Sequence, residues 1–165
     1  MKAGSLLLSA SGLLTLGMSL WWIRRRYLVA TVSGPSMEPT LRSGDRLLVR
    51  KTRRVRAGQI VVVRIPNPPP LDGLPPGIEP GDEDKAPERF DPGWHLLVKR
   101  AVAVSGEPVP RQEFPSLRDV PETVVPPRAL VVLGDNRDTS WDSREFGFVR
   151  GDQFIGVMMR RLPSR

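Results

Sequence analysis

The sequence predicts a mostly β protein, an antiparallel sheet or barrel with one apolar helix at the N-terminus. From residue 27 onward, short runs rich in valine, leucine and isoleucine recur between glycine, proline or charge clusters. The chain also contains 15 glycines and 18 prolines, which favour turns and short strands over long helices. Because no helical pattern alternates with these runs, we expect a sheet without βαβ crossovers.

The N-terminal helix is expected at residues 6–23, an 18-residue run (LLLSASGLLTLGMSLWWI) that carries no charge. As a helix it would span roughly 27 Å, close to the hydrocarbon thickness of a bilayer. Trp21 and Trp22 then lie where an aromatic belt would be, and the arginines at 24–26 follow at the interface. No small-x-small cleavage site follows the run, so we expect a membrane anchor behind a short tail at 1–5, not a cleaved signal peptide.

The remaining chain, residues 27–165, is expected to form one β-rich domain without long helices. Residues 66–93 hold nine prolines and seven acidic residues in 28 positions, so they predict an exposed loop between two strands. The predicted strands are 27–32, 46–50, 59–65, 95–104, 129–133 and 154–162.

Composition excludes several kinds of site. The chain has no cysteine, which excludes thiol catalysis, disulfides and thiolate metal sites. Its single histidine, His95, excludes a His-pair metal site, and we expect it to have no catalytic role. We expect neither a metal nor a cofactor. The net charge of +7, carried mostly by arginine, is typical of a surface facing anionic lipid or nucleic acid, without establishing either.

Lys99 is the first candidate for chemistry, in the predicted strand HLLVKRAVAV. Strand alternation places Leu97, Lys99 and Ala101 on one face, and Val98 and Arg100 on the other. A buried lysine can lose its proton near neutral pH, whereas arginine keeps it, so a neutral amine here could take a proton from a serine. The alternative is an edge-strand lysine that extends to water.

Two polar segments add further candidates. SGPSMEPTL at 33–41 places Ser36 between Pro35 and Pro39, which suits a turn and equally a rigidly held nucleophile. GDNRDTSWDSREFGFV at 134–149 combines dense opposite charges with an apolar end. This pattern favours a turn whose ion pairs brace a site over a merely solvated turn. Its spacing does not match a calcium-binding EF-hand loop.

Together, these segments resemble the successive signature boxes of the type I signal peptidases, Ser-Lys dyad enzymes of the S26 family. SMEPTL at 36–41, AGQIVVV at 57–63, VKRAVAVSGEPV at 98–109 and LGDNRDTSWDSREFGFV at 133–149 occur in the family's order. The resemblance covers most of the chain from about residue 29. It implies a membrane-anchored serine endopeptidase that removes signal peptides from exported preproteins through an acyl-enzyme intermediate.

Residue by residue, the resemblance implies that Ser36 is the nucleophile and Lys99 the general base. Ser140 corresponds to the hydroxyl that orients the lysine. The backbone N–H of Ser36 would supply one oxyanion donor. Gly34 stands where bacterial members often have a hydroxyl residue, so a second donor is unassigned.

The resemblance also implies a supporting set around the dyad. Asp142 and Arg144 correspond to paired charges that brace the site, and Asp135 belongs to the same turn. Four apolar residues near the dyad are expected to wall shallow pockets for small side chains before the cut: Val32, Met37, Leu97 and Val98.

The expected partners are preprotein signal peptides and the lipid bilayer, with no nucleic acid and a monomeric enzyme. The resemblance places the catalytic domain on the extracytoplasmic side, whereas the arginines at 24–26 favour the cytoplasm; we expect the former. One alternative is a dedicated processing peptidase for a pilin or a single secreted peptide. Another is a noncatalytic basic membrane protein that binds nucleic acid or anionic lipid. Self-cleaving repressors share the Ser-Lys core but carry a DNA-binding head in place of the apolar helix.

Overall fold

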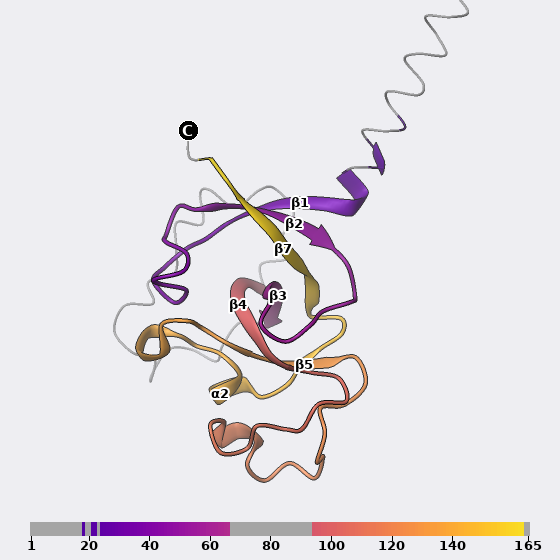
Figure 1. The fold of residues 1–165 in the computed structure, drawn as a ribbon, viewed down its shortest axis with the longest axis vertical. Coiled ribbons are helices and arrows are strands. Elements are labelled where there is room, and N and C mark those ends of the chain that lie inside the picture. The colour runs from indigo at the N-terminus through magenta and orange to yellow at the C-terminus, as the bar shows by residue number, and fades with distance from the viewer. Residues whose placement is uncertain (1–17, 19–20, 23, 67–93, 164–165) are drawn as a thin grey trace, which may run out of the picture.

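The computed structural model describes residues 18, 21–22, 24–66 and 94–163. Residues 24–26 are helical and lead directly into the first strand (Figure 1). The elements that follow are β1 (Tyr27–Thr31), β2 (Arg46–Lys51), β3 (Ile60–Pro66), β4 (Trp94–Val104), η2 (Pro115–Leu117), β5 (Ala129–Leu133), η3 (Arg137–Thr139), α2 (Ser143–Phe146), β6 (Val149–Arg150) and β7 (Phe154–Leu162).

The strands form one sheet in the order β1-β2-β7-β3-β4-β5-β6, and every neighbouring pair is antiparallel. This confirms the predicted mostly β, antiparallel fold without βαβ crossovers. The last strand, β7, lies between β2 and β3 (Figure 1). It therefore joins the N-terminal strands β1 and β2 to β3 and to β4, the strand that carries Lys99. Within the described residues the edge strands β1 and β6 do not pair, so the sheet stays open.

Each predicted strand is present, with ends that differ by at most one residue. Strand β6 was not predicted, because it has two residues and no pattern of its own. It forms because Val149 and Arg150 pair with Leu130 and Ala129 of β5. The longest helix among the elements named above is α2, with four residues, in agreement with the expected lack of long helices in this domain.

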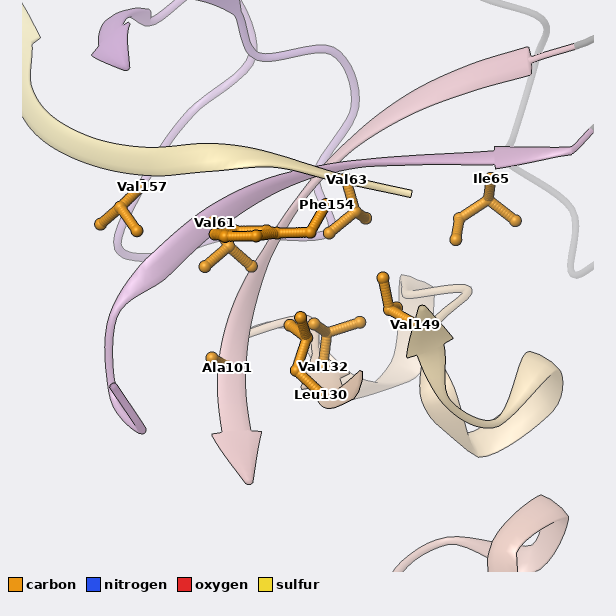
Figure 2. Close-up of a cluster of buried hydrophobic side chains, with 9 residues drawn as sticks. All are labelled: Val61, Val63, Ile65, Ala101, Leu130, Val132, Val149, Phe154 and Val157. Carbon is orange, nitrogen blue, oxygen red and sulfur yellow. The ribbon is translucent and has the colours of Figure 1, made fainter. Parts of the chain in front are cut away.

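The valine run of β3 is explained by burial on both of its faces. Val61 and Val63 belong to one apolar cluster and Val62 to another, and all three side chains are 0% exposed. Figure 2 shows Val61 and Val63 pointing from β3 toward Leu130 and Val132 of β5. A strand buried on both faces needs an uninterrupted apolar run rather than an alternating one.

The predicted anchor at 6–23 and the tail at 1–5 fall almost entirely outside the described residues. In the part of the chain that the structure describes, no helix is both long and apolar enough to span a bilayer. Trp21 and Trp22 are described, and the guanidinium groups of Arg25 and Arg26 lie over their rings at 4.3 and 4.6 Å. The predicted loop at 66–93 is outside the described residues except for Pro66, which is the last residue of β3.

Candidate active site

Lys99 lies in the middle of β4, opposite Val61 of β3. Its side chain is only 2% exposed. Leu97 and Ala101, two residues to either side, contribute to the same apolar cluster as Val61, so the predicted alternation is correct. The alternative of a lysine that extends to water is therefore wrong.

The buried amine has one hydrogen-bond partner among the described residues. Lys99 Nζ donates to Ser140 Oγ at 2.9 Å, and the Ser140 hydroxyl donates to Asp142 Oδ2 at 2.6 Å. Ser140 is 8% exposed and Asp142 is fully buried. Because the single hydroxyl proton goes to the carboxylate, the Ser140 oxygen is left free to accept from the amine. The structure thus links amine, hydroxyl and carboxylate in a buried chain.

The Asp142 carboxylate is held ionised by its surroundings. Gly134 N donates to Oδ2 at 3.0 Å, and the Arg144 backbone N–H and Nε donate to Oδ1 at 3.1 and 3.0 Å. Burial on its own would raise the pKa of Asp142, but the hydrogen bonds from Arg144, Gly134 and Ser140 outweigh it and lower that pKa. The predicted pairing of Asp142 with Arg144 is present in the structure.

Burial lowers the pKa of Lys99 to about 8. The negative charges of Asp142 and Glu145 act in the opposite direction, and Arg144 adds to the lowering. With such a pKa, roughly a tenth of the amine is neutral at pH 7 and about half at pH 8. The group can therefore accept a proton near neutral pH, which an arginine at this position could not do.

The turn that carries Ser36 is fastened to the turn that follows β5. Asn136 N donates to the Ser36 carbonyl oxygen at 3.0 Å, and Leu41 N donates to the Met37 carbonyl oxygen at 2.9 Å. The Met37 side chain is fully buried, whereas Ser36 is half-buried. Met37 thus anchors the turn in the core, while the adjacent Ser36 keeps access to solvent.

Gly134 is the point at which these parts meet. A Cβ atom there would clash with Ser140 Oγ and would lie 2.6 Å from the Ser36 carbonyl oxygen. The Gly134 N–H also donates to Asp142. The structure therefore brings the Ser36 turn beside the hydroxyl that binds Lys99, although no hydrogen bond joins Ser36 to Lys99 among the residues described.

Comparison with known proteins agrees with this arrangement. The chain is 34% identical over 151 residues to a Signal peptidase I of Bacillus caldolyticus, an alignment that covers 81% of this chain and 79% of that protein. The chain belongs to the signal peptidase I family. It is also 29% identical over 152 residues to Signal peptidase IB of Staphylococcus aureus strain N315, covering 80% of this chain and 75% of the relative.

Two family models match separate parts of this signal peptidase I family member. The model described as signal peptidase, peptidase S26 matches residues 110–162, which include the Ser140 to Arg144 turn. The model described as peptidase S24-like matches residues 9–70, which include Ser36. The chain is therefore a serine peptidase.

Asp135 supports the site of this peptidase from a different direction. Arg100 Nε and Nη2 donate to its two carboxylate oxygens at 2.8 and 2.6 Å. These bonds, with a further one from the Thr40 side chain, lower the pKa of Asp135. Asp135 thus ties β4 to the segment just after Ser36. Strand alternation predicts that Arg100 lies on the face opposite Lys99, but the sequence indicates no role for Arg100 or Thr40, because only the fold brings them to Asp135.

Glu145 is another residue of the site that was not predicted from the sequence. Asp142 N donates to Glu145 Oε2 at 2.8 Å, and the Asp142 carboxylate in turn caps the first turn of α2. The signal was present in the sequence, since DSRE has the spacing of a capping box, an N-cap residue followed three positions later by glutamate.

The four apolar residues expected to wall the pockets fall into two groups. Val32 and Met37 are 3% and 0% exposed and share a cluster against which Val98 packs. Leu97 packs instead against the cluster on the other face of β4. The structure therefore brings three of the four together and separates Leu97 from them. His95, for which no role was expected, is exposed near the start of β4.

No group of three or more His, Asp or Glu side chains within residues 24–66 and 94–163 is arranged to hold a metal ion.

Gly134→Ala is expected to destabilise the peptidase by about 1–3 kcal/mol and to reduce its activity strongly, because the added methyl displaces Ser140 or the Ser36 carbonyl. Urea unfolding measures the first effect and peptide cleavage the second. Gly106→Ala is the control: this glycine has φ of +87° and open space around it, so alanine strains the backbone without touching the site. Equal activity in the two variants would contradict the packing role of Gly134.

Proposed function

We propose that the chain is a membrane-anchored serine endopeptidase that removes signal peptides from exported preproteins, with Ser36 as nucleophile and Lys99 as general base. The observation that carries the proposal is the buried Lys99 amine, with its lowered pKa, held on Ser140 next to the Ser36 turn. The names of the relatives, signal peptidase I and IB, support the substrate class. No cofactor enters the proposed reaction.

In the proposed acylation step, the neutral Lys99 amine takes the proton of the Ser36 hydroxyl as the serine oxygen attacks the scissile carbonyl carbon. The Ser36 backbone N–H stabilises the oxyanion that forms. The C–N bond then breaks, and the Lys99 ammonium gives its proton to the leaving amine. The product is an ester between Ser36 and the signal peptide.

In the proposed deacylation step, Lys99 takes a proton from a water molecule, which attacks the ester carbonyl. The bond to the Ser36 oxygen breaks, and the serine regains its proton from the ammonium. Each step passes through a charged Lys99. The ionised Asp142, acting through the Ser140 hydroxyl, is positioned to stabilise that charge as it develops.

Burial and Asp142 have complementary effects on the proposed base. Burial keeps a fraction of Lys99 neutral before the reaction, and the buried carboxylate favours the ammonium once the proton has moved. Arg144 offsets part of the negative charge, so the pKa stays near 8 and does not return to that of a free lysine. Of the four apolar residues expected near the dyad, the partly buried Leu97 and Val98 are the proposed contacts for small residues before the cut, whereas Val32 and Met37 are buried in the core.

The proposal is tested by incubating the purified full chain, in detergent, with a panel of preproteins that have Ala-x-Ala before the expected cut. We expect one cut directly after that motif, mapped by mass spectrometry. Cleavage of a single member of the panel would favour a dedicated processing peptidase. No cleavage of any member would overturn the proposed activity toward signal peptides and leave the family membership unaffected.

We further propose that residues 6–23 anchor a monomeric enzyme, and that the peptidase domain at 27–165, with its loop at 66–93, lies on the extracytoplasmic face. Twelve residues separate Ile23 from Ser36, at most roughly 40 Å, which keeps the nucleophile near the membrane surface. Residues 24–66 contain ten arginines and one lysine against two acidic residues, and this excess favours contact with anionic headgroups.

Protease treatment of intact cells, or of spheroplasts where an outer membrane is present, tests this orientation. We expect external protease to remove the peptidase domain while a cytoplasmic marker protein survives. An intact peptidase domain under conditions that degrade a known surface protein would place the domain in the cytoplasm. That result would mean that the arginines at 24–26 determine the topology.

A further inference from the structure

Glu145 connects the supporting turn to the proposed base without belonging to the hydrogen-bonded chain itself. Its Oε2 atom accepts from Asp142 N at 2.8 Å, and Asp142 accepts from the Arg144 backbone N–H at 3.1 Å. The bond from Asp142 N to Glu145 and the complementary bond from the Glu145 backbone N–H to the Asp142 side chain form a capping box at the start of α2, which has only four residues. So short a helix has little stability of its own. The capping box therefore helps to maintain this turn, together with Ser143, whose hydroxyl accepts from Val132 N and whose carbonyl accepts from Ser116 Oγ.

The same turn determines where Asp142 points, and Asp142 holds Ser140, the partner of Lys99. A change in the Asp142 backbone is therefore transmitted through two short hydrogen bonds to the amine. Position 145 is exposed at the surface, so its charge acts on Lys99 through partly screened space.

The charges around Lys99 come almost entirely from one segment of the chain. Asp142, Arg144 and Glu145 all act on it, with Arg144 opposing the two carboxylates. The residue opposite Lys99 on β3 is Val61, and β5 consists of apolar residues only. The Arg100 to Asp135 ion pair neutralises itself on the other face of β4, and Glu38 in the Ser36 turn is exposed. Glu145 is thus the one exposed member of the charged group.

We propose that Glu145 is a positioning residue for the Lys99 base, with two separable roles: its oxygen fixes the Asp142 backbone, and its negative charge stabilises the ammonium form of Lys99. The inference rests on the proposed function of Lys99 as general base. The two roles have opposite consequences for the reaction. The hydrogen bond from Asp142 N to Glu145 supports the maximal rate, whereas the negative charge of Glu145 reduces the fraction of neutral Lys99 amine at low pH.

Three substitutions separate the two roles. Glu145→Gln keeps an oxygen that can accept from Asp142 N and removes the charge. Glu145→Asp keeps the negative charge, but on a shorter side chain that cannot reach the Asp142 backbone N–H. Glu145→Ala removes both the oxygen and the charge. The matched control is Glu107→Gln, because Glu107 Oε2 accepts from Val104 N at the same 2.8 Å and with the same three-residue spacing. This bond is not part of the hydrogen-bonded chain formed by Lys99, Ser140 and Asp142.

The first measurement is kcat/KM for a model preprotein between pH 5 and pH 10. For Glu145→Gln we expect an unchanged plateau and an acid limb shifted to lower pH, so the variant is faster than wild type below the midpoint. Removing a negative charge destabilises the ammonium, which lowers the pKa of Lys99 and enlarges its neutral fraction. For Glu145→Asp we expect an unshifted limb and a plateau lower by roughly fivefold, and for Glu145→Ala both changes.

The second measurement does not depend on activity. The chain has four lysines, Lys2, Lys51, Lys85 and Lys99, so the ¹³Cε signals of labelled lysine are few, and the Lys99→Arg variant assigns the one of interest. We expect the Lys99 titration midpoint to fall in Glu145→Gln and to stay constant in Glu107→Gln. An unchanged midpoint in Glu145→Gln, or a full plateau in Glu145→Ala, would overturn the inference. A third outcome is that the wild-type chain cleaves nothing, while the Lys99 titration midpoint still falls in Glu145→Gln. That outcome would overturn the proposed function and leave the electrostatic role of Glu145 supported.

Discussion

Ser36→Ala is expected to slow preprotein cleavage by at least roughly a thousandfold, because the variant has no hydroxyl at the position from which Lys99 would take a proton. The fold should be retained. Ser36 is half-buried, and the turn is held by the Ser36 backbone carbonyl and the buried Met37 side chain, neither of which the substitution removes. The unfolding free energy should therefore change by less than about 1 kcal/mol.

The measurement is single-turnover cleavage followed by mass spectrometry, with urea unfolding on the same preparations. Ser105→Ala is the control, since Ser105 is an exposed serine in the turn after β4 and should retain wild-type activity. Cleavage by Ser36→Ala at more than a few per cent of the wild-type rate would show that another group is the nucleophile. It would remove the dyad from the mechanism and leave the family membership unaffected.

Lys99→Arg is expected to be almost as inactive, because a guanidinium keeps its proton at every pH at which the protein is folded. Arginine is also larger than lysine, and the Lys99 side chain is buried, so Lys99→Met serves as the second variant. Methionine fills a similar volume without a charge, and the variant should be folded and inactive. Full activity in either variant would mean that the base lies elsewhere.

The pH dependence of stability tests the burial of Lys99 independently of catalysis. The pKa of Lys99 is about 8 in the folded chain and 10.5 in an unperturbed lysine, so between these pH values the unfolded chain binds more protons. The unfolding free energy of the wild type should therefore rise by up to about 3 kcal/mol from pH 8 to pH 10.5, relative to Lys99→Met. Below pH 8 Lys99 is protonated in both the folded and the unfolded chain, so the unfolding free energy is reduced by the full cost of burying the ammonium. Parallel stability curves for the two proteins would contradict a buried, perturbed lysine.

Local sequence patterns predicted the strands well, because each strand is a short apolar run that ends at glycine, proline or a charge. The alternation around Lys99 also placed its side chain correctly among apolar neighbours, since in an extended strand the next-but-one residues share a face. The alternation left open whether the amine is buried or extends to water, and the structure decided for burial. The short β6 was missed because a two-residue strand exists only through its partner, β5. The proposed anchor at 6–23 and the loop at 66–93 remain predictions, because almost all of their residues lie outside those described.

The site was harder to predict than the strands. Nothing local to Gly134 indicates that a side chain there would strike both Ser140 and the Ser36 carbonyl. Arg100 and Asp135 are 35 positions apart, and their ion pair depends on β5 lying beside β4. The roles of the individual site residues came from the family resemblance, and they stand as proposals that the substitutions above test.

The sequence by itself determined which segments are strands, that Lys99 faces apolar neighbours and, through four motifs in a fixed order, the peptidase family. These properties depend on near neighbours in the chain or on motif order, and both can be read directly. Only the tertiary structure decided that Lys99 meets Ser140, 41 positions away, and that the Ser36 turn packs against Gly134. The first contact depends on β5 lying beside β4, whereas the second joins the turn after β1 to the turn after β5, two strands that are not neighbours in the sheet. Hydrogen bonds between such distant residues form only where the whole fold places them.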